Sequence, residues 1–374
     1  MQNGIHLSLM IGPAVPAPVP KDVLDALASV QVTTSTDGPS GFQLTFNISN
    51  KSPLETLFLL SGGATVPLIR VIITVSVNGS SDVLIDGVIT NQQITPGNSG
   101  SATLTITGED LTRVMDYIDF SGIPYPCMPP EARVAVALAK YLDFGVVPLV
   151  IPSVLIDVPI PVQRIPRQQG TDLQYVKSLA ADVGYVFYHE PGPAPGTSFA
   201  YWGPEVKVGE PQPALNINMD AFSNVESMNF SYNGDGKVMP IVFVQEPITK
   251  APIPIPIPDI TPLSPPLGLI PPLPKQFEIL EKTAKYSFPQ AIMIGLAKAA
   301  KTSEAVKASG TLNVLRYGRV LKARKLVGVR GAGPAFDGLY YVRGVTHNLK
   351  RGEYKQSFTL SRNGLLSTVQ QVPA

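Results

Sequence analysis

The side chains able to act as a base, a nucleophile or a metal ligand are few and lie far apart. The three histidines, His6, His189 and His347, have no second histidine or carboxylate at the spacing of a metal site. The sequence also lacks the His-Glu-x-x-His zinc motif, the Gly-x-Ser-x-Gly elbow and a phosphate loop ending in Gly-Lys-Ser/Thr. We therefore expect no catalytic residue, no cofactor and no bound metal, and we expect that the chain is not an enzyme.

Four carboxylates form the densest acidic group and offer the main alternative to that view. Glu109, Asp110, Asp116 and Asp119 lie within eleven positions, and glycoside hydrolysis uses a pair of carboxyl groups. A glycan- or peptidoglycan-active β-protein is thus one alternative function. Glu109 and Asp110, however, precede a predicted helix, where acidic side chains favour the positive end of the helix dipole.

His347 and Cys127 have simpler interpretations. His347 lies on a predicted strand, where a single histidine more often packs or forms a hydrogen bond than acts as a base. Cys127 is the only cysteine, so it forms no internal disulfide and has no partners for a zinc site.

The composition indicates a surface covered by other protein subunits. The 374 residues include 29 basic and 28 acidic ones, and only 15% are charged, against about 25% in an average soluble protein. A net charge of +1 argues against nucleic-acid binding, which needs a basic excess. No run reaches the roughly 18 to 20 apolar residues of a membrane span, and the N-terminal apolar stretch has no basic leader. We expect neither membrane insertion nor a signal peptide, although the many Thr and Ser residues leave a secreted adhesin as a further alternative.

The first hundred residues predict antiparallel strands. Apolar and polar residues alternate in residues 42–48, 71–77 and 101–107, and Asn78-Gly79 is a hairpin turn signal. From residue 108 the spacing of apolar residues becomes helical, which marks the start of a helical insert. Short strands with glycine-rich turns imply a small sandwich or barrel.

The clearest helix begins at Thr171. Thr171 and Gln174 fit a capping box, and Gly184 fits the left-handed residue that ends a helix. Aromatic residues on both sides of the Pro/Gly turn at 191–196 then predict a hairpin.

Residues 247–274 contain 11 prolines, including the alternating run Pro-Ile-Pro-Ile-Pro-Ile-Pro at 252–258. Such a run excludes a helix or a central strand and predicts an extended, semi-rigid strap. It is either a linker between domains or, given its many Ile and Leu residues, a strap that lies on a partner. The partner contacts predicted in the strap are Pro252, Pro254, Pro256, Pro258 and Ile270.

Three segments, in this order, resemble the late-control-D type baseplate hub of contractile phage tails and related contractile injection systems, a family that includes VgrG-like hubs. They are residues 97–116 (GNSGSATLTITGEDLTRVMD), residues 167–190 (RQQGTDLQYVKSLAADVGYVFYHE) and the closing hairpin at 338–365 (GLYYVRGVTHNLKRGEYKQSFTLSRNGL). The resemblance covers most of the chain from about residue 40 onward. In the hairpin it assigns Tyr340 to packing and His347 and Arg362 to structural or interface positions, and we predict these three residues as interface candidates.

The resemblance implies a mainly β, α+β protein with two related small antiparallel β-barrels per chain. The predicted domains are a first barrel in residues 1–113 with about 205–236, a helical and β insertion domain in residues 114–204, and a second barrel in residues 237–374. The second barrel would carry the strap at 247–274 and a helical insertion at about 289–309.

The resemblance also implies a function. Three chains would form a ring with pseudo-sixfold symmetry that adapts a sixfold tail tube to a threefold central spike. The expected partners are two further copies of the chain, the inner tail-tube protein, the spike and other baseplate proteins. Relatives that carry the spike continue into a glycine-rich β-structure, whereas this sequence ends at Ala374, so we expect a separate spike protein. Assembly is expected in the bacterial or host cytoplasm, and the sequence leaves open whether the particle is a phage tail, an extracellular injection device or a membrane-anchored one.

Overall fold

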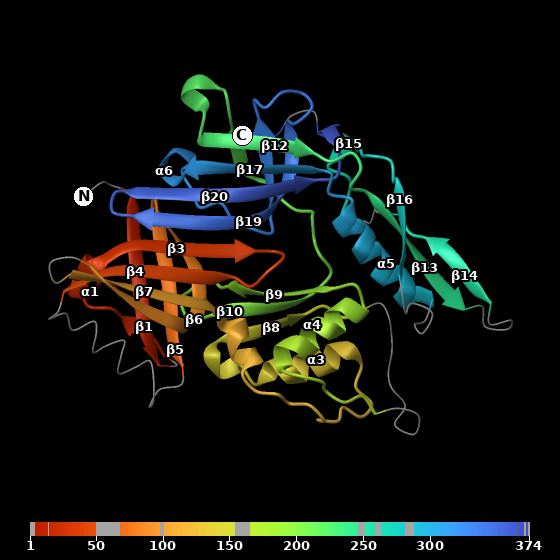
Figure 1. Ribbon diagram of the computed structural model, residues 1–374, viewed down its shortest axis with the longest axis horizontal. Coiled ribbons are helices and arrows are strands. Elements are labelled where there is room, and N and C mark those ends of the chain that lie inside the picture. The colour runs from red at the N-terminus through yellow and green to blue at the C-terminus, as the bar shows by residue number, and fades with distance from the viewer. Residues whose placement is uncertain are drawn as a thin grey trace.

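Most strands of the protein belong to one large antiparallel sheet (Figure 1). The computed structural model describes residues 4–13, 15–49, 68–97, 101–153, 165–245, 251–258, 263–280, 288–369 and 372. The N-terminal strands of the sheet are β1 (Ile5–Pro13), β2 (Ala17–Pro18), β3 (Leu27–Ser35), β4 (Gly41–Ser49), β5 (Ile69–Val77), β6 (Ser80–Pro96) and β7 (Ser101–Asp110). The C-terminal strands are β11 (Gln212–Asn216), β12 (Val225–Tyr232), β17 (Val306–Asn313), β18 (Leu326–Arg330), β19 (Gly338–Lys350) and β20 (Glu353–Arg362). The mainly β, antiparallel fold class is thereby confirmed.

The apolar residues of the alternating sequence pattern are buried in the structure. The apolar residues of the alternating pattern on β4, β5 and β7 that are buried are Phe42, Leu44, Phe46, Ile48, Val71, Ile73, Val75, Val77, Leu104 and Ile106. Every second side chain of a strand points to the same face, so these positions form one continuous apolar layer.

β6 is a long strand whose two halves pair with different neighbours. Residues 80–88 pair with β5 and residues 87–96 pair with β7. At Gly87 a Cβ atom would lie 2.1 Å from the carbonyl oxygen of Glu109. Only glycine allows the backbones to approach this closely.

The two ends of the chain are joined directly, because β3 pairs with β19 over residues 29–35 and 344–350. The hydroxyl oxygens of Thr33 and Thr346 are 3.1 Å apart across this pairing. One apolar core therefore includes residues of both the N-terminal and the C-terminal strands. Val32 and Phe46 come from the N-terminal strands, and Val345 and Phe358 come from the C-terminal strands. Among the described strands, the order runs from β12 to β2 without a pairing that closes it.

The strands in residues 205–236 require a correction to the predicted domains. β12 pairs antiparallel with β17, and β11 pairs parallel with β18, so both belong to the C-terminal part. We predicted this segment together with residues 1–113. Leu215 and Val225 are instead buried beside strands that come a hundred residues later, because a strand pairs where its apolar face completes a core.

The insertion between β7 and β11 packs helices on one face of a small sheet (Figure 1). Its elements are η2 (Leu111–Asp116), α3 (Pro130–Ala139), η3 (Leu142–Phe144), β8 (Val146–Val150), α4 (Asp172–Asp182), β9 (Val186–Pro191) and β10 (Ser198–Gly203). The Thr171 side chain accepts a hydrogen bond from the amide of Gln174 at 3.3 Å, and Gly184 has a φ of 71°. The predicted helix, its cap and the following hairpin are thus confirmed.

A third unit, here called the arm, projects beside the main sheet (Figure 1). It contains β13 (Val238–Gln245), β14 (Pro252–Pro256) and β16 (Gln276–Leu280), in the order β14-β13-β16, and α5 (Phe288–Thr302), which packs on β13. The remaining elements are α1 (Lys21–Ala26), η4 (Asp220–Phe222), β15 (Gly268–Ile270), α6 (Val314–Tyr317) and β21 (Leu365–Ser367). Among the described residues, no helix combines the length and apolar composition needed to cross a bilayer.

Candidate assembly surfaces

His347 lies inside the main sheet in a hydrogen-bonded group. Its Nδ1 atom is 2.7 Å from the hydroxyl oxygen of Tyr354, whose O–H donates to the neutral ring. The amide of Gln356 lies 3.3 Å from the same atom and also bonds to both main-chain groups of Leu321. Burial lowers the pKa of His347 to about 3. The ring is therefore uncharged near neutral pH, and Gln356 beside it links the closing hairpin to the loop before β18.

Arg362 donates three hydrogen bonds to main-chain oxygens, two of them in the loop before β19 and one just after β20. Its nitrogens donate to Gly364 at 2.7 Å, to Asp337 at 2.8 Å and to Ala335 at 2.7 Å. The guanidinium also lies 4.6 Å from the ring centroid of Tyr340. A buried charge that binds carbonyls and an aromatic face in this way stabilises the fold locally.

The interface role of Tyr340, His347 and Arg362 stays a prediction. These residues are only 0%, 4% and 1% exposed. Their polar groups bind within the chain, so they meet a partner only if the sheet opens.

The strap residues predicted as partner contacts lie at the surface. Pro252, Pro254, Pro256 and Pro258 are exposed, and Ile270 on β15 is 52% exposed. Their role in an interface stays a prediction. In the described part of the strap, Pro252–Pro256 forms an edge strand, β14.

Proline and isoleucine direct their main-chain groups to opposite sides of β14. The amide of Ile257 donates to the carbonyl of Pro240 at 3.0 Å. Main-chain groups of alternate residues point to the same side of a strand, so Ile253 and Ile255 also face β13. The prolines face the free edge, where they offer no N–H to another strand.

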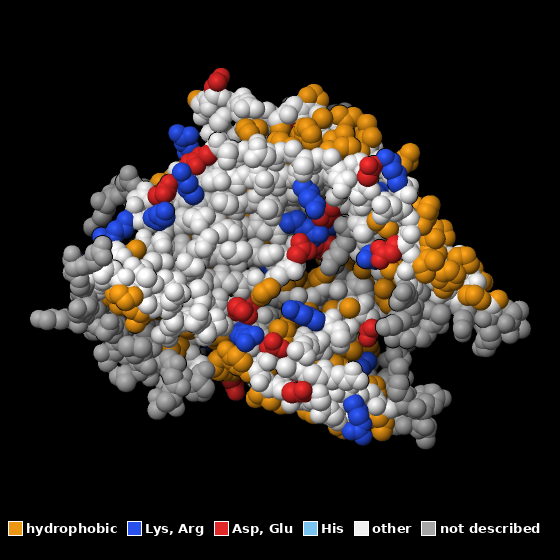
Figure 2. Space-filling view, in the orientation of Figure 1, with side chains coloured by type: hydrophobic (Ala, Val, Ile, Leu, Met, Phe, Trp, Pro, Cys, Tyr) orange, Lys and Arg blue, Asp and Glu red, His pale blue; other side chains and the backbone are white. Residues whose placement is uncertain are grey.

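Hydrophobic side chains gather on the arm and on the neighbouring β15 region, as the space-filling view shows (Figure 2). Leu269, Leu273, Phe277 and Ile279 are 62%, 80%, 64% and 58% exposed. All four come from one short stretch of the chain. Exposed apolar patches of this kind mark sites of protein–protein contact.

A charged group centred on Arg343 joins distant parts of the chain. The guanidinium of Arg343 lies 2.9 Å from carboxylate oxygens of both Glu205 and Glu304, and Lys207 lies 2.8 Å from Glu304. Burial alone would lower the pKa of Arg343, but Glu304 and Glu205 outweigh it and the pKa is raised. The group connects β19, the exit from the insertion and the end of α5.

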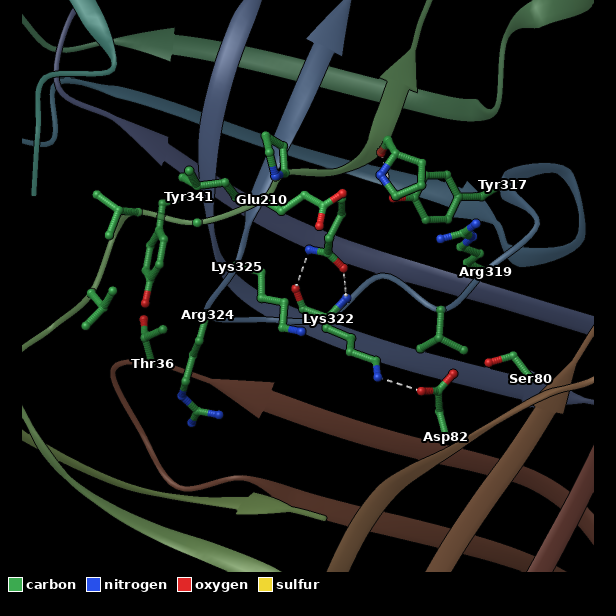
Figure 3. Close-up of a pocket in the computed structure, with 18 of the residues that line it drawn as sticks. Thr36, Ser80, Asp82, Glu210, Tyr317, Arg319, Lys322, Arg324, Lys325 and Tyr341 are labelled. Atoms are coloured by element: carbon green, nitrogen blue, oxygen red, sulfur yellow. Dashed lines mark hydrogen bonds and ion pairs between the residues drawn. The ribbon is translucent and has the colours of Figure 1, made fainter. Parts of the chain in front are cut away.

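A cavity of about 980 Å³ lies next to this group, between the ends of the N-terminal strands and the loop before β18 (Figure 3). In it Lys322 lies 2.6 Å from Asp82, and Arg324 donates to the carbonyl of Ser35 at 2.6 Å and lies 4.2 Å from the centroid of the Tyr188 ring. The described lining has hydroxyl groups but no histidine or cysteine to form a nucleophile and base pair. The cavity therefore lies where the N-terminal strands, the insertion and the C-terminal strands meet.

Three of the four acidic residues considered for glycan cleavage accept structural hydrogen bonds. Asp110 caps η2 by accepting from the amide of Thr112 at 3.0 Å. Asp116 accepts from the hydroxyl of Thr171 at 2.6 Å. Asp119 accepts from the amide of Ser121 at 2.7 Å. Hydrogen bonds from the side chain and the main chain of Ser121 lower the pKa of Asp119. In the part of the chain that the structure describes, no three His, Cys, Asp or Glu side chains form a metal-binding group.

Known proteins share this architecture along the whole chain. A tail protein from Neisseria meningitidis MC58 superposes with a TM-score of 0.62 and 15% identity, covering 97% of this chain and 98% of its own. The 43 kDa tail protein of prophage MuSo2 from Shewanella oneidensis gives 0.60 and 12%, covering 96% and 98%. The chain has the fold of phage tail proteins. The resemblance to a tail hub is confirmed at the level of the fold.

The tail-protein fold also extends to a secretion-system component. The c3393 protein of E. coli, a component of the type VI secretion system described as similar to the T4 tail proteins gp27 and gp5, gives a TM-score of 0.51 at 12% identity, covering 93% of this chain and 76% of its own. No protein-family model and no curated protein sequence matches the chain.

The sequence analysis missed two features of this tail-protein fold. It did not predict the group around Arg343, because its members lie up to 138 positions apart and carry no local signal. It also did not predict that β16 completes the arm sheet, although Phe277 and Ile279 alternate with Gln276 and Glu278 as in a strand.

Proposed function

We propose that the chain is a structural baseplate hub of a contractile tail or a related contractile injection system. The observation that carries the proposal is the match to whole tail proteins, since the superposition covers nearly all of this chain and nearly all of the other. Such coverage involves the main sheet, the insertion and the arm together. Three separate segments of the sequence resemble tail hubs as well.

In the proposed assembly three copies form a ring. Each copy would supply two related β units, one from the N-terminal strands and one from the C-terminal strands, and the pairing of β3 with β19 supports treating them as one rigid body. Six similar units would face a sixfold tail tube, and the threefold ring would hold a separate central spike. Closed symmetry with repeated interfaces is the common solution for such assemblies.

The proposed domains follow the predicted ones with the correction given above. Residues 1–113 would form the first barrel and residues 114–204 the insertion. Residues 237–374 would form the second barrel, joined by the strands of residues 205–236 and carrying the arm. The chain would work in a particle assembled in the bacterial cytoplasm, through protein contacts with tube, spike and baseplate proteins and without binding nucleic acid or entering a membrane.

The test is the mass of the purified chain by light scattering, alone and mixed with the spike candidate encoded nearby. We expect a trimer, or three chains on each spike trimer. The spike alone serves as the control for its own mass. A chain that remains monomeric and binds no spike candidate would overturn the proposal.

A further inference from the structure

The insertion and the main sheet have separate apolar cores. The core of the insertion contains Met115, Val134, Leu179 and Trp202, and Val88 is its only described buried member that comes from a strand of the main sheet. The core of the main sheet includes none of the described residues of the insertion. Apolar packing therefore contributes little to the contact between the two units, and each unit has a core of its own.

Buried charged groups form part of this contact. Arg70 on β5 lies 2.7 Å from Asp86 on β6, and the two side chains are 6% and 0% exposed. Arg70 also donates to the carbonyl of Gly196 in the insertion at 3.3 Å. Arg324, in the loop before β18, lies against the ring of Tyr188 in the insertion. The contact thus depends on polar groups that water would solvate if the units separated.

His189 lies in this contact, on the edge strand β9 of the small sheet (Figure 1). The residue is 2% exposed, and neither ring nitrogen has a hydrogen-bond partner among the described residues. The charged groups that act on the ring are Asp110 at the end of β7, Asp86, Arg324 and Arg70. Two are acidic and two are basic, so a charged ring would add an uncompensated positive charge to a buried site.

Ser198 adds another buried polar group without a partner. Its hydroxyl forms no hydrogen bond within the described chain, and the residue is 0% exposed. Ala200 pairs with His189 across the small sheet, and Ser198 is two residues from Ala200, so the side chains of Ser198 and His189 lie on the same face. Buried polar groups without partners weaken the contact that covers them.

We propose that uptake of a proton by His189 separates the insertion from the main sheet, while each unit keeps its own core. The proton places a third positive charge beside Arg70 and Arg324. Both nitrogens of the charged ring are donors, but the nearby carboxylates of Asp86 and Asp110 already bind Arg70 and the start of η2. The inference does not rest on the proposed hub function.

The direction of the pH dependence follows from the burial of the ring. Burial lowers the pKa of His189 in the closed form, whereas a hydrated histidine has a pKa of about 6.5. The open form therefore binds the proton at higher pH than the closed form, and the contact weakens as the pH falls below about 6.5. For one proton, the ratio of open to closed molecules rises by up to about 25-fold between pH 7 and pH 5.

The test measures how fast a thiol placed at the contact is modified. In a Cys127→Ser background, which removes the exposed cysteine, Ser198→Cys introduces this thiol by the change of one atom. Its rate of labelling by dithiodipyridine is divided by the rate in the same protein carrying His189→Leu, which removes the effect of pH on the thiol itself. We expect this ratio to rise at least about tenfold between pH 7 and pH 5. A ratio that is independent of pH would overturn the proposal.

A matched thiol in the main sheet distinguishes separation of the units from unfolding of the whole chain. Ser361→Cys is also a change of one atom, because Ser361 on β20 is 2% exposed and its hydroxyl has no partner in the described chain. We expect the thiol at position 198 to become reactive at a higher pH than the thiol at position 361. If acid exposes both thiols at the same pH, the chain unfolds as one unit and the proposal is wrong. This comparison keeps His189, so it holds even where His189→Leu does not fold.

Discussion

A Cβ atom on Gly184 would lie 2.5 Å from the carbonyl oxygen of Met293. Gly184 ends α4 of the insertion, and Met293 belongs to α5 of the arm, so the two units pack backbone against backbone at this point. Because glycine has no side chain, the two backbones can approach this closely. The contact fixes the arm relative to the insertion.

Gly184→Ala is expected to destabilise the protein more than Gly196→Ala. Both glycines have positive φ, 71° and 84°, so each alanine costs about 1 kcal/mol of backbone strain. Only at Gly184 does the new methyl group meet backbone atoms, which adds about 1–3 kcal/mol; at Gly196 nothing lies within 4 Å. Urea unfolding followed by circular dichroism measures both. Equal losses would mean that the packing of α4 on α5 contributes nothing.

The neutral His347 predicts a loss of stability in acid. Burial holds its folded-state pKa at about 3, below the ordinary histidine pKa of 6.5. The unfolded chain therefore binds a proton at higher pH than the folded chain, and stability falls as the pH drops below about 6.5, by up to about 1.4 kcal/mol per pH unit.

The matched variant for this effect is His347→Gln, which cannot take up the proton. Between pH 7.5 and pH 5 its unfolding free energy should fall less than that of the parent. His189 is also buried with a lowered pKa, so part of the acid sensitivity should remain. Parallel curves for parent and variant would contradict the assignment.

Arg343→Met should destabilise the protein by about 3 kcal/mol, because it leaves the carboxylates of Glu205 and Glu304 without their main partner in a poorly hydrated site. Lys207 would compensate for only part of the charge. The double variant Arg343→Met with Glu205→Gln should recover stability. Urea unfolding of the four proteins in the cycle gives the coupling energy, and a value near zero would show that the ion pairs are independent.

Replacing Pro252, Pro254 and Pro256 together by Thr should make the chain associate beyond its normal mass. The change gives the outer edge of β14 the N–H groups that it lacks, and an unprotected edge pairs with other chains. Light scattering over a concentration series measures this. Ile253→Thr, which alters a position facing β13, is the control and should leave the mass unchanged.

The features that the sequence predicts well are local. Alternation identifies β4, β5 and β7, and the cap at Thr171 with the stop at Gly184 identifies α4. The least accurate boundaries lie near residues 289–330. There the helical insertion predicted at about 289–309 ends at Thr302 and gives way to β17, which begins at Val306. Helix and strand compete closely in such mixed segments, and packing decides between them.

Long-range pairing is not predictable from the sequence alone. Nothing local in residues 205–236 indicates that β12 pairs with β17, and nothing in Arg343 indicates Glu205 as its partner. The same limit applies to Tyr340, His347 and Arg362, whose residue types suit either a core or an interface. Their burial depends on β19 lying between β3 and β20.

The pairing of β3 with β19 also governs the order in which the protein can form during synthesis. Thr33 and Thr346 are separated by 313 positions. At about 5–20 residues per second, a ribosome needs on the order of 15 to 60 s to travel that distance. Throughout this interval one side of β3 has no native partner, so that edge stays open to pairing with other chains until the last hairpin emerges.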